Sequence, residues 1–272
     1  MPMPPKDRFI LWITILVVLA GCGTLPDGRR WGDGVTLRPG WNRVGAAARE
    51  AVLAPQTWAP LTGAALFRLT NWDQDVSDWA IEHHPIFGSN ANARAKSITL
   101  HDTTAAIWGI TVLAAPGGKD VGPWLTSKAR GVMVQGAAML TAQGITEGLK
   151  SATNRPRPDR WTNNDNSFPS GHATSAASLA TFAYHNLETL ALSETEKLAA
   201  GIGLGALTAV NGWVRIEAFK HYPSDVLTGI ALGYFISEFF NNAFLGLDEY
   251  SSVRPGMEFS SDNVMVGLSG NF

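Results

Sequence analysis

The chain has 272 residues, of which 45% are hydrophobic and 16% are charged, and its formal net charge is -2. This length allows one large domain or two small ones. The lack of a basic excess argues against general nucleic-acid binding, which needs a positively charged surface.

The N-terminus has the pattern of a targeting segment. Lys6 and Arg8 precede an apolar run from Phe9 to Ala20, which is short for a membrane span and suits the core of a signal peptide. The run ends in Leu19-Ala20-Gly21-Cys22, which resembles the bacterial lipoprotein signal. The resemblance implies that residues 1–21 are removed and that Cys22 receives lipid, palmitate included. The alternative is an uncleaved anchor helix.

The residues around Cys22 also indicate a compartment and a domain plan. Gly23 rather than Asp follows Cys22, which by the same resemblance favours an outer-membrane lipoprotein facing the periplasm. Cys22 is the only cysteine, so no intramolecular disulfide can form. Residues 22–40 are rich in Gly, Asp and Arg and predict a tether. We expect residues 41–248 to form one helical domain and residues 249–272 to be a tail packed on it.

Apolar residues recur near helical spacing in several segments, which predicts an all-α fold. The predicted helices cover Trp41–Ala54, Pro60–Leu69, Thr99–Ala115, Pro123–Leu149, Ala173–Leu192, Leu198–Val214 and Asp225–Leu245. Alternating apolar residues at Asn263–Ser269 indicate a possible small strand. The expected fold is a single bundle of about six main helices with short extra helices.

The segment Asn71–Asp78 carries alternating carboxylates at Asp73 and Asp75, as calcium loops do. The glycine and the distal glutamate of a calcium loop are not in place. Helix capping by Asp75 or Ser77 is therefore the better interpretation.

The long apolar segments have nearly the length of a membrane span, about 20 residues. Charged and amide side chains within them argue against that interpretation, because such groups are costly at membrane depth. These residues are Gln135, Gln143, Glu147, His185, Glu188, Glu238, Asn241 and Asn242. We favour a lipid-tethered bundle over a protein with several spans.

Three ordered blocks between Lys150 and Asp225 carry the chemistry. The first is Lys150 followed after six residues by Arg157-Pro158, the second is Pro169-Ser170-Gly171-His172, and the third contains Arg215, His221 and Asp225. Lysine and arginine are seldom buried without a partner, so three cations within apolar segments predict a bound anion.

A phosphate ester, with about two negative charges, fits these residues. Lys150, Arg157 and Arg215 supply cationic donors, Ser170 a hydroxyl, and Gly171 a backbone N–H at a helix start. We call these five residues the phosphate cradle. The same donors would stabilise the added charge of the transition state, so we expect no metal and no other cofactor.

The second histidine of the stretch, His221, lies four residues before Asp225. If a helix begins near His221, the two side chains share one face, and the carboxylate can hold the imidazole in one tautomer. Pro223 between them restricts this arrangement to a first helical turn.

The three blocks resemble the signature of the type 2 phosphatidic acid phosphatase family, which shares its fold with bacterial acid phosphatases and vanadium haloperoxidases. The resemblance implies that His221 is the nucleophile that forms a phosphohistidine. It also implies that His172 protonates the leaving oxygen and later activates water. Val214 stands where the family usually has serine, and only ten residues separate Pro158 from Pro169.

The expected function is a metal-independent phosphatase, which makes residues 41–248 the phosphatase domain. Its substrate is a phosphorylated small molecule or a lipid or prenyl (di)phosphate. Contact with the membrane is expected through the lipid on Cys22, with no nucleic-acid partner. The alternatives are a vanadium-dependent haloperoxidase and a lipoprotein that binds phosphate or lipid without turnover. The pattern leaves the oligomeric state open.

Overall fold

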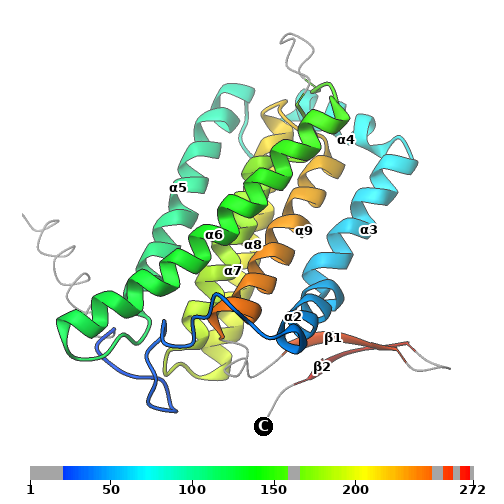
Figure 1. Ribbon diagram of the computed structural model, residues 1–272. Coiled ribbons are helices and arrows are strands. Elements are labelled where there is room, and N and C mark those ends of the chain that lie inside the picture. The colour runs from blue at the N-terminus through cyan, green and yellow to red at the C-terminus, as the bar shows by residue number, and fades with distance from the viewer. Residues whose placement is uncertain (1–20, 159–165, 247–253, 260–263, 270–272) are drawn as a thin grey trace, which may run out of the picture.

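The computed structural model describes residues 21–158, 166–246, 254–259 and 264–269. Almost all of the predicted signal peptide lies outside these ranges. Eight α-helices of the described chain form a bundle (Figure 1), which confirms the predicted all-α fold. They are α2 (Trp41–Leu53), α3 (Pro55–Leu69), α4 (Trp72–His83), α5 (Asn90–Ala114), α6 (Val121–Thr153), α7 (Gly171–Glu188), α8 (Glu194–Glu217) and α9 (Pro223–Phe240). The π-helical turn η1 (Asn241–Leu245) follows α9.

Several helices begin earlier than the sequence pattern predicts. Helix α3 starts at Pro55, because proline fits the first turn of a helix. Helix α5 starts at Asn90, where the side chain of Ser89 accepts a hydrogen bond from the Asn92 N–H. The predicted cap of α4 is wrong, since that helix starts at Trp72 after Asn71, whose backbone is left-handed.

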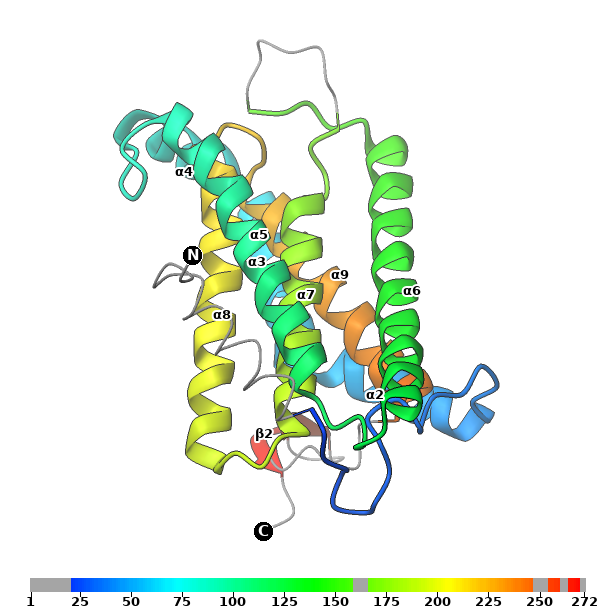
Figure 2. The same ribbon diagram turned by 90° about the vertical axis from the view of Figure 1, so that its left-hand side faces the viewer.

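Helix α7 is the central element, and most of its side chains are buried. Helices α5, α6, α8 and α9 pack around it, as Figure 2 shows from the side. One apolar cluster joins Phe182 of α7 to Ala138 and Ala142 of α6 and Ile236 of α9. The core therefore lies along α7.

The backbones of α7 and α9 touch along two glycines of α9. A Cβ added at Gly229 would lie 2.6 Å from the carbonyl oxygen of Ser170, and one at Gly233 would lie 2.2 Å from that of Thr174. Both distances are shorter than any real contact of this kind, so only glycine permits this approach. The start of α9 is thereby held against the start of α7.

The predicted tether is irregular, but it packs closely on the bundle. Trp31 is only 1% exposed and lies against Gly131, where an added Cβ would be 2.0 Å from the indole ring. The Gly32 N–H donates to the hydroxyl of Ser127 at 3.0 Å. The domain therefore begins well before residue 41.

After η1, the chain forms a small antiparallel hairpin of β1 (Arg254–Phe259) and β2 (Val264–Ser269), in which Arg254 is opposite Ser269. The possible strand at residues 263–269 is confirmed, whereas its partner β1 was not predicted. Within the described part of the chain, no helix combines the length and the apolar character that crossing a bilayer requires.

Candidate active site

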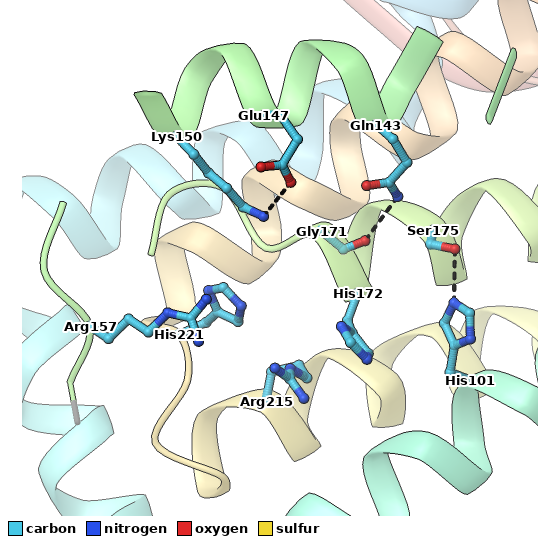
Figure 3. A pocket seen from close by; sticks show the side chains of 10 residues that line it. All are labelled: His101, Gln143, Glu147, Lys150, Arg157, Gly171, His172, Ser175, Arg215 and His221. Carbon is cyan, nitrogen blue, oxygen red and sulfur yellow. Dashed lines mark hydrogen bonds and ion pairs between the residues drawn. The ribbon is translucent and has the colours of Figure 1, made fainter. Parts of the chain in front are cut away.

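The candidate active site lies at the end of the bundle where α6 and α8 end and α7 and α9 begin (Figure 2). A pocket of about 510 Å³ opens there. Its lining residues are His101, Gln143, Glu147, Lys150, Arg157, Gly171, His172, Ser175, Arg215 and His221 (Figure 3). Six of these residues were predicted from the sequence, and the other four were not.

The three predicted cations converge on this pocket from α6, the loop after it, and α8. Lys150 is paired with Glu147 at 2.7 Å, and Arg215 donates to the hydroxyl of Ser97 at 2.7 Å. The Nε atoms of Arg157 and Arg215 are buried and have no hydrogen-bond partner among the described residues. A buried N–H without an acceptor costs about 1–3 kcal/mol, which a bound anion would offset.

Burial and a neighbouring charge change the acidity of Arg215. Burial, and then the neighbouring Arg157, lower the pKa of Arg215 to about 10. Both effects disfavour the charged guanidinium, and a bound anion would oppose them. The arrangement of cations therefore suits a multiply charged oxyanion.

Helix α7 presents its N-terminus to the pocket through Gly171 and His172. The first N–H groups of a helix have no partner within it, and the helix dipole favours negative charge there. Ser170 is the N-cap residue, and its hydroxyl accepts from the Ala173 N–H at 3.4 Å. Ser170 does not line the pocket, so its predicted contact with phosphate stays a prediction.

His221 is 3% exposed, and its ring is oriented by a backbone carbonyl. Nδ1 lies 2.7 Å from the carbonyl oxygen of Ser167. A carbonyl can only accept, so Nδ1 carries the proton and Nε2 keeps a lone pair. Burial, and then the Arg215 charge, hold the pKa of His221 well below its usual 6.5. The imidazole is therefore neutral near pH 7.

Asp225 lies beside His221 as predicted, but it does not hold the imidazole in one tautomer, and the sequence prediction is wrong on that point. Helix α9 begins at Pro223, so His221 precedes it, and Asp225 Oδ2 is 3.9 Å from His221 Nδ1. Instead the carboxylate accepts from the Ser167 hydroxyl at 2.6 Å and from the Tyr222 N–H at 2.9 Å. Asp225 thus positions His221 through two residues: Ser167, whose carbonyl contacts the imidazole, and Tyr222, which follows His221 in the chain.

A buried ion-pair network that the sequence did not predict supports Asp225. Arg155 contacts Asp225 at 2.5 Å and Asp73 of α4 at 2.8 Å. Asp73 is 4% exposed and also accepts from the Ser224 N–H at 2.8 Å and from its hydroxyl at 2.5 Å. Asp73 therefore fixes the first turn of α9. This role could not be predicted without knowing how α4 packs.

Burial and hydrogen-bond partners act on Asp225 in opposite directions. Burial is the larger effect and raises the pKa of this carboxyl group, while Arg155, Ser167 and the Tyr222 N–H act to lower it. These donors favour the ionised form against the cost of burial.

His172 is the other histidine of the pocket, and a histidine that was not predicted lies beside it. Burial, and then the Arg215 charge, lower the pKa of His172 to about 4. The ring of His101 on α5 has its centroid 5.5 Å from that of His172. No spacing rule links these two residues, so only the packing of α5 on α7 reveals the pair.

Val214, the departure from the family pattern, does not line the pocket. It is fully buried and packs with Ala93 of α5 and with Ala218, beside Phe87 and Leu100. A hydroxyl at this position would face an apolar cluster rather than a substrate.

Cys22, the predicted lipidation site, lies at the other end of the bundle. The backbone on either side of it accepts hydrogen bonds from Gly117 and Gly118, which follow α5. Lys128 in the early part of α6 is the charged neighbour of Cys22, and burial lowers the pKa of this lysine to about 7. Lys128 and Lys150 are 22 residues apart on α6, or about 33 Å along the helix.

Comparisons with known proteins agree with the fold. Residues 131–246 match the family model described as the PAP2 superfamily. Among solved structures, the chain resembles one described as the first transmembrane PAP2 type phosphatidylglycerolphosphate phosphatase from Bacillus subtilis, with 22% identity and a TM-score of 0.51. That match covers 74% of this chain and 96% of the other. No curated protein matches the sequence.

Proposed function

We propose that this chain, which belongs to the PAP2 superfamily through residues 131–246, is a metal-independent phosphatase. It would hydrolyse phosphomonoesters or lipid and prenyl (di)phosphates through a phosphohistidine intermediate. The observation that carries the proposal is the convergence of three cations and two histidines on one pocket at a helix N-terminus. The solved neighbour's phosphatidylglycerolphosphate activity supports the inclusion of lipid phosphates.

In the first step, the lone pair of His221 Nε2 forms a bond to phosphorus while the bond from phosphorus to the leaving oxygen breaks. The Ser167 carbonyl supports this assignment, because it holds the proton on Nδ1. Protonated His172 donates its proton to the leaving oxygen. The bound phosphate makes that protonation favourable, because its negative charge raises the pKa of His172 above about 4.

In the second step, neutral His172 takes a proton from water as the water oxygen bonds to phosphorus and the phosphorus–nitrogen bond breaks. Phosphate leaves, and His221 regains its lone pair. Lys150, Arg157 and Arg215 stabilise the equatorial oxygens in both transition states. Asp225 stabilises the transient positive charge on His221 from 3.9 Å.

The proposal is tested by phosphate release from p-nitrophenyl phosphate in the presence of EDTA. We expect turnover in the wild type and its loss in His221→Ala, with a control variant, His83→Ala, retaining full activity because His83 is exposed on α4. Rapid quenching with ³²P-labelled substrate should trap an acid-labile, alkali-stable phosphoenzyme that His221→Ala does not form. Undiminished turnover in His221→Ala would overturn the mechanism.

We further propose that the protein is a lipoprotein anchored at Cys22 in the outer membrane and facing the periplasm. The Leu-Ala-Gly-Cys sequence at residues 19–22 supports this proposal. Labelling with a palmitate analogue should be lost in Cys22→Ser, and that variant should be released without detergent. A Cys22→Ser protein that still requires detergent would show that other surfaces hold it on the membrane.

A further inference from the structure

We infer that His101, Gln143, Glu147 and Ser175, here named the leaving-group subsite, bind the hydroxyl groups of a polyol phosphate. The preferred leaving group is then a hydroxyl-bearing alcohol such as a glycerol unit. The inference rests on the proposed function and names its substrate class. The four residues complete the lining of the pocket beyond the phosphate cradle and the two histidines, and each has a polar side chain.

Two members of the subsite flank the proposed acid. Ser175 lies one turn after His172 on α7, and its hydroxyl is 2.8 Å from Nε2 of His101. The ring of His101 is in turn close to that of His172 (Figure 3). His172 must reach the leaving oxygen, so the carbon skeleton attached to that oxygen lies near this serine–histidine pair.

The other two members lie on α6 and face the same pocket. Gln143 donates through Nε2 to the Gly171 carbonyl at 3.3 Å, and its Oε1 remains as an acceptor. Glu147 contacts Lys150 through one oxygen, and a carboxylate has further acceptor sites. Hydroxyl groups are the natural partners of these acceptors.

An alkyl or prenyl chain bonded directly to the phosphate fits this lining poorly. It would exclude water from four polar side chains without replacing their hydrogen bonds. A site built to bind a substrate hydroxyl discriminates strongly against the analogue that lacks it. Hydroxylated leaving groups are therefore favoured.

The test uses pairs of substrates that share the phosphate and the carbon skeleton. Glycerol 3-phosphate is compared with propyl phosphate in solution, and 1-oleoylglycerol 3-phosphate is compared with 3-(oleoyloxy)propyl phosphate in detergent micelles. We expect at least a tenfold higher kcat/KM for the hydroxylated member of one pair or both, and the pair identifies a soluble or a lipid source. A ratio below about threefold in both pairs overturns the inference.

Variants then assign the preference to the subsite. His101→Ala and, as a smaller change, Ser175→Ala should each lower the hydroxylated-to-alkyl ratio at least threefold. His83→Ala is the matched control and should leave both rates and their ratio unchanged. An equal loss for both substrates in His101→Ala and in Ser175→Ala contradicts the inference.

Failure of this inference is distinguishable from failure of the proposed function. If the wild type releases phosphate from p-nitrophenyl phosphate through His221 but shows no hydroxyl preference, only the substrate class is wrong. If no phosphate is released from any of these substrates, the proposed function itself is wrong.

Discussion

Replacement of Arg155 by methionine should strongly destabilise the protein. Arg155 is the shared partner of Asp73 and Asp225, whose side chains are 6% and 0% exposed. Removal of one partner of a buried ion pair typically costs about 3–5 kcal/mol, because the remaining charge is buried without compensation. Here one substitution leaves two such carboxylates. The expected decrease in Tm is roughly 6–20 °C at about 2–4 °C per kcal/mol.

The assay combines urea unfolding, followed by tryptophan fluorescence, with steady-state kinetics on p-nitrophenyl phosphate. Arg68→Met is the matched control, because Arg68 is exposed at the end of α3 and should lose no more than about 0.5 kcal/mol. We also expect kcat to fall in Arg155→Met, since Asp225 and the first turn of α9 hold the segment that carries His221.

The double variant Asp73→Asn/Arg155→Met tests the electrostatic cause. It removes one of the two uncompensated charges, so it should be more stable than Arg155→Met alone. A loss below about 1 kcal/mol in the single variant would refute the reasoning, as would a double variant less stable than the single one.

Three further predictions concern other parts of the chain. Val214→Ser buries a hydroxyl in an apolar cluster, so urea unfolding should show that the free energy of unfolding falls by about 1–3 kcal/mol. Turnover should change less than tenfold, and a larger gain would place residue 214 in the catalytic site. Burial alone lowers the pKa of His185, but Glu238 and Glu188 outweigh it and raise that pKa to about 10. The stability that this ion pair contributes is complete below pH 6.5 and is lost as the pH rises toward 10. The free energy of unfolding, measured between pH 7 and pH 10, should therefore fall less in His185→Gln than in the wild type. Parallel curves for the two proteins would contradict the assignment. Because the pKa of His221 is well below 6.5, the acidic limb of kcat/KM should lie below pH 6.5 when phosphate release is followed across pH, and a limb at or above that pH would argue against His221 as the nucleophile.

The local pattern of the sequence is sufficient to predict the fold class and several residues that line one pocket. Helical periodicity depends only on neighbouring residues, so it identifies the segments of the bundle. The spacing of Lys150 and Arg157 and the block from Ser170 to His172 are likewise patterns of residues close together in the sequence. These residues lie at helix ends that meet in space, and four of the five cradle residues line the pocket.

Contacts between segments distant in the sequence are what the pattern does not reveal. Asp73 is 151 residues from Ser224, which donates to it, and in the sequence it stood out only as part of a poor calcium loop. His101 is likewise 74 residues from Ser175. Helix α9 starts at Pro223, two residues after His221, and Asp225 Oδ2 stays 3.9 Å from His221 Nδ1, so the predicted direct hold on the imidazole is not made.

The two glycines of α9 that touch α7 have a consequence for the rate of reaction. His172 is carried by α7 and His221 by the segment that enters α9, so the separation of acid and nucleophile depends on how closely these two helices approach. Gly233 lies ten residues into α9, about 15 Å from its start. A side chain there would have to displace α7 by about 1 Å, and such a misplacement of reacting groups can reduce a rate about 100-fold. Catalytic efficiency is therefore sensitive to a position that no substrate reaches.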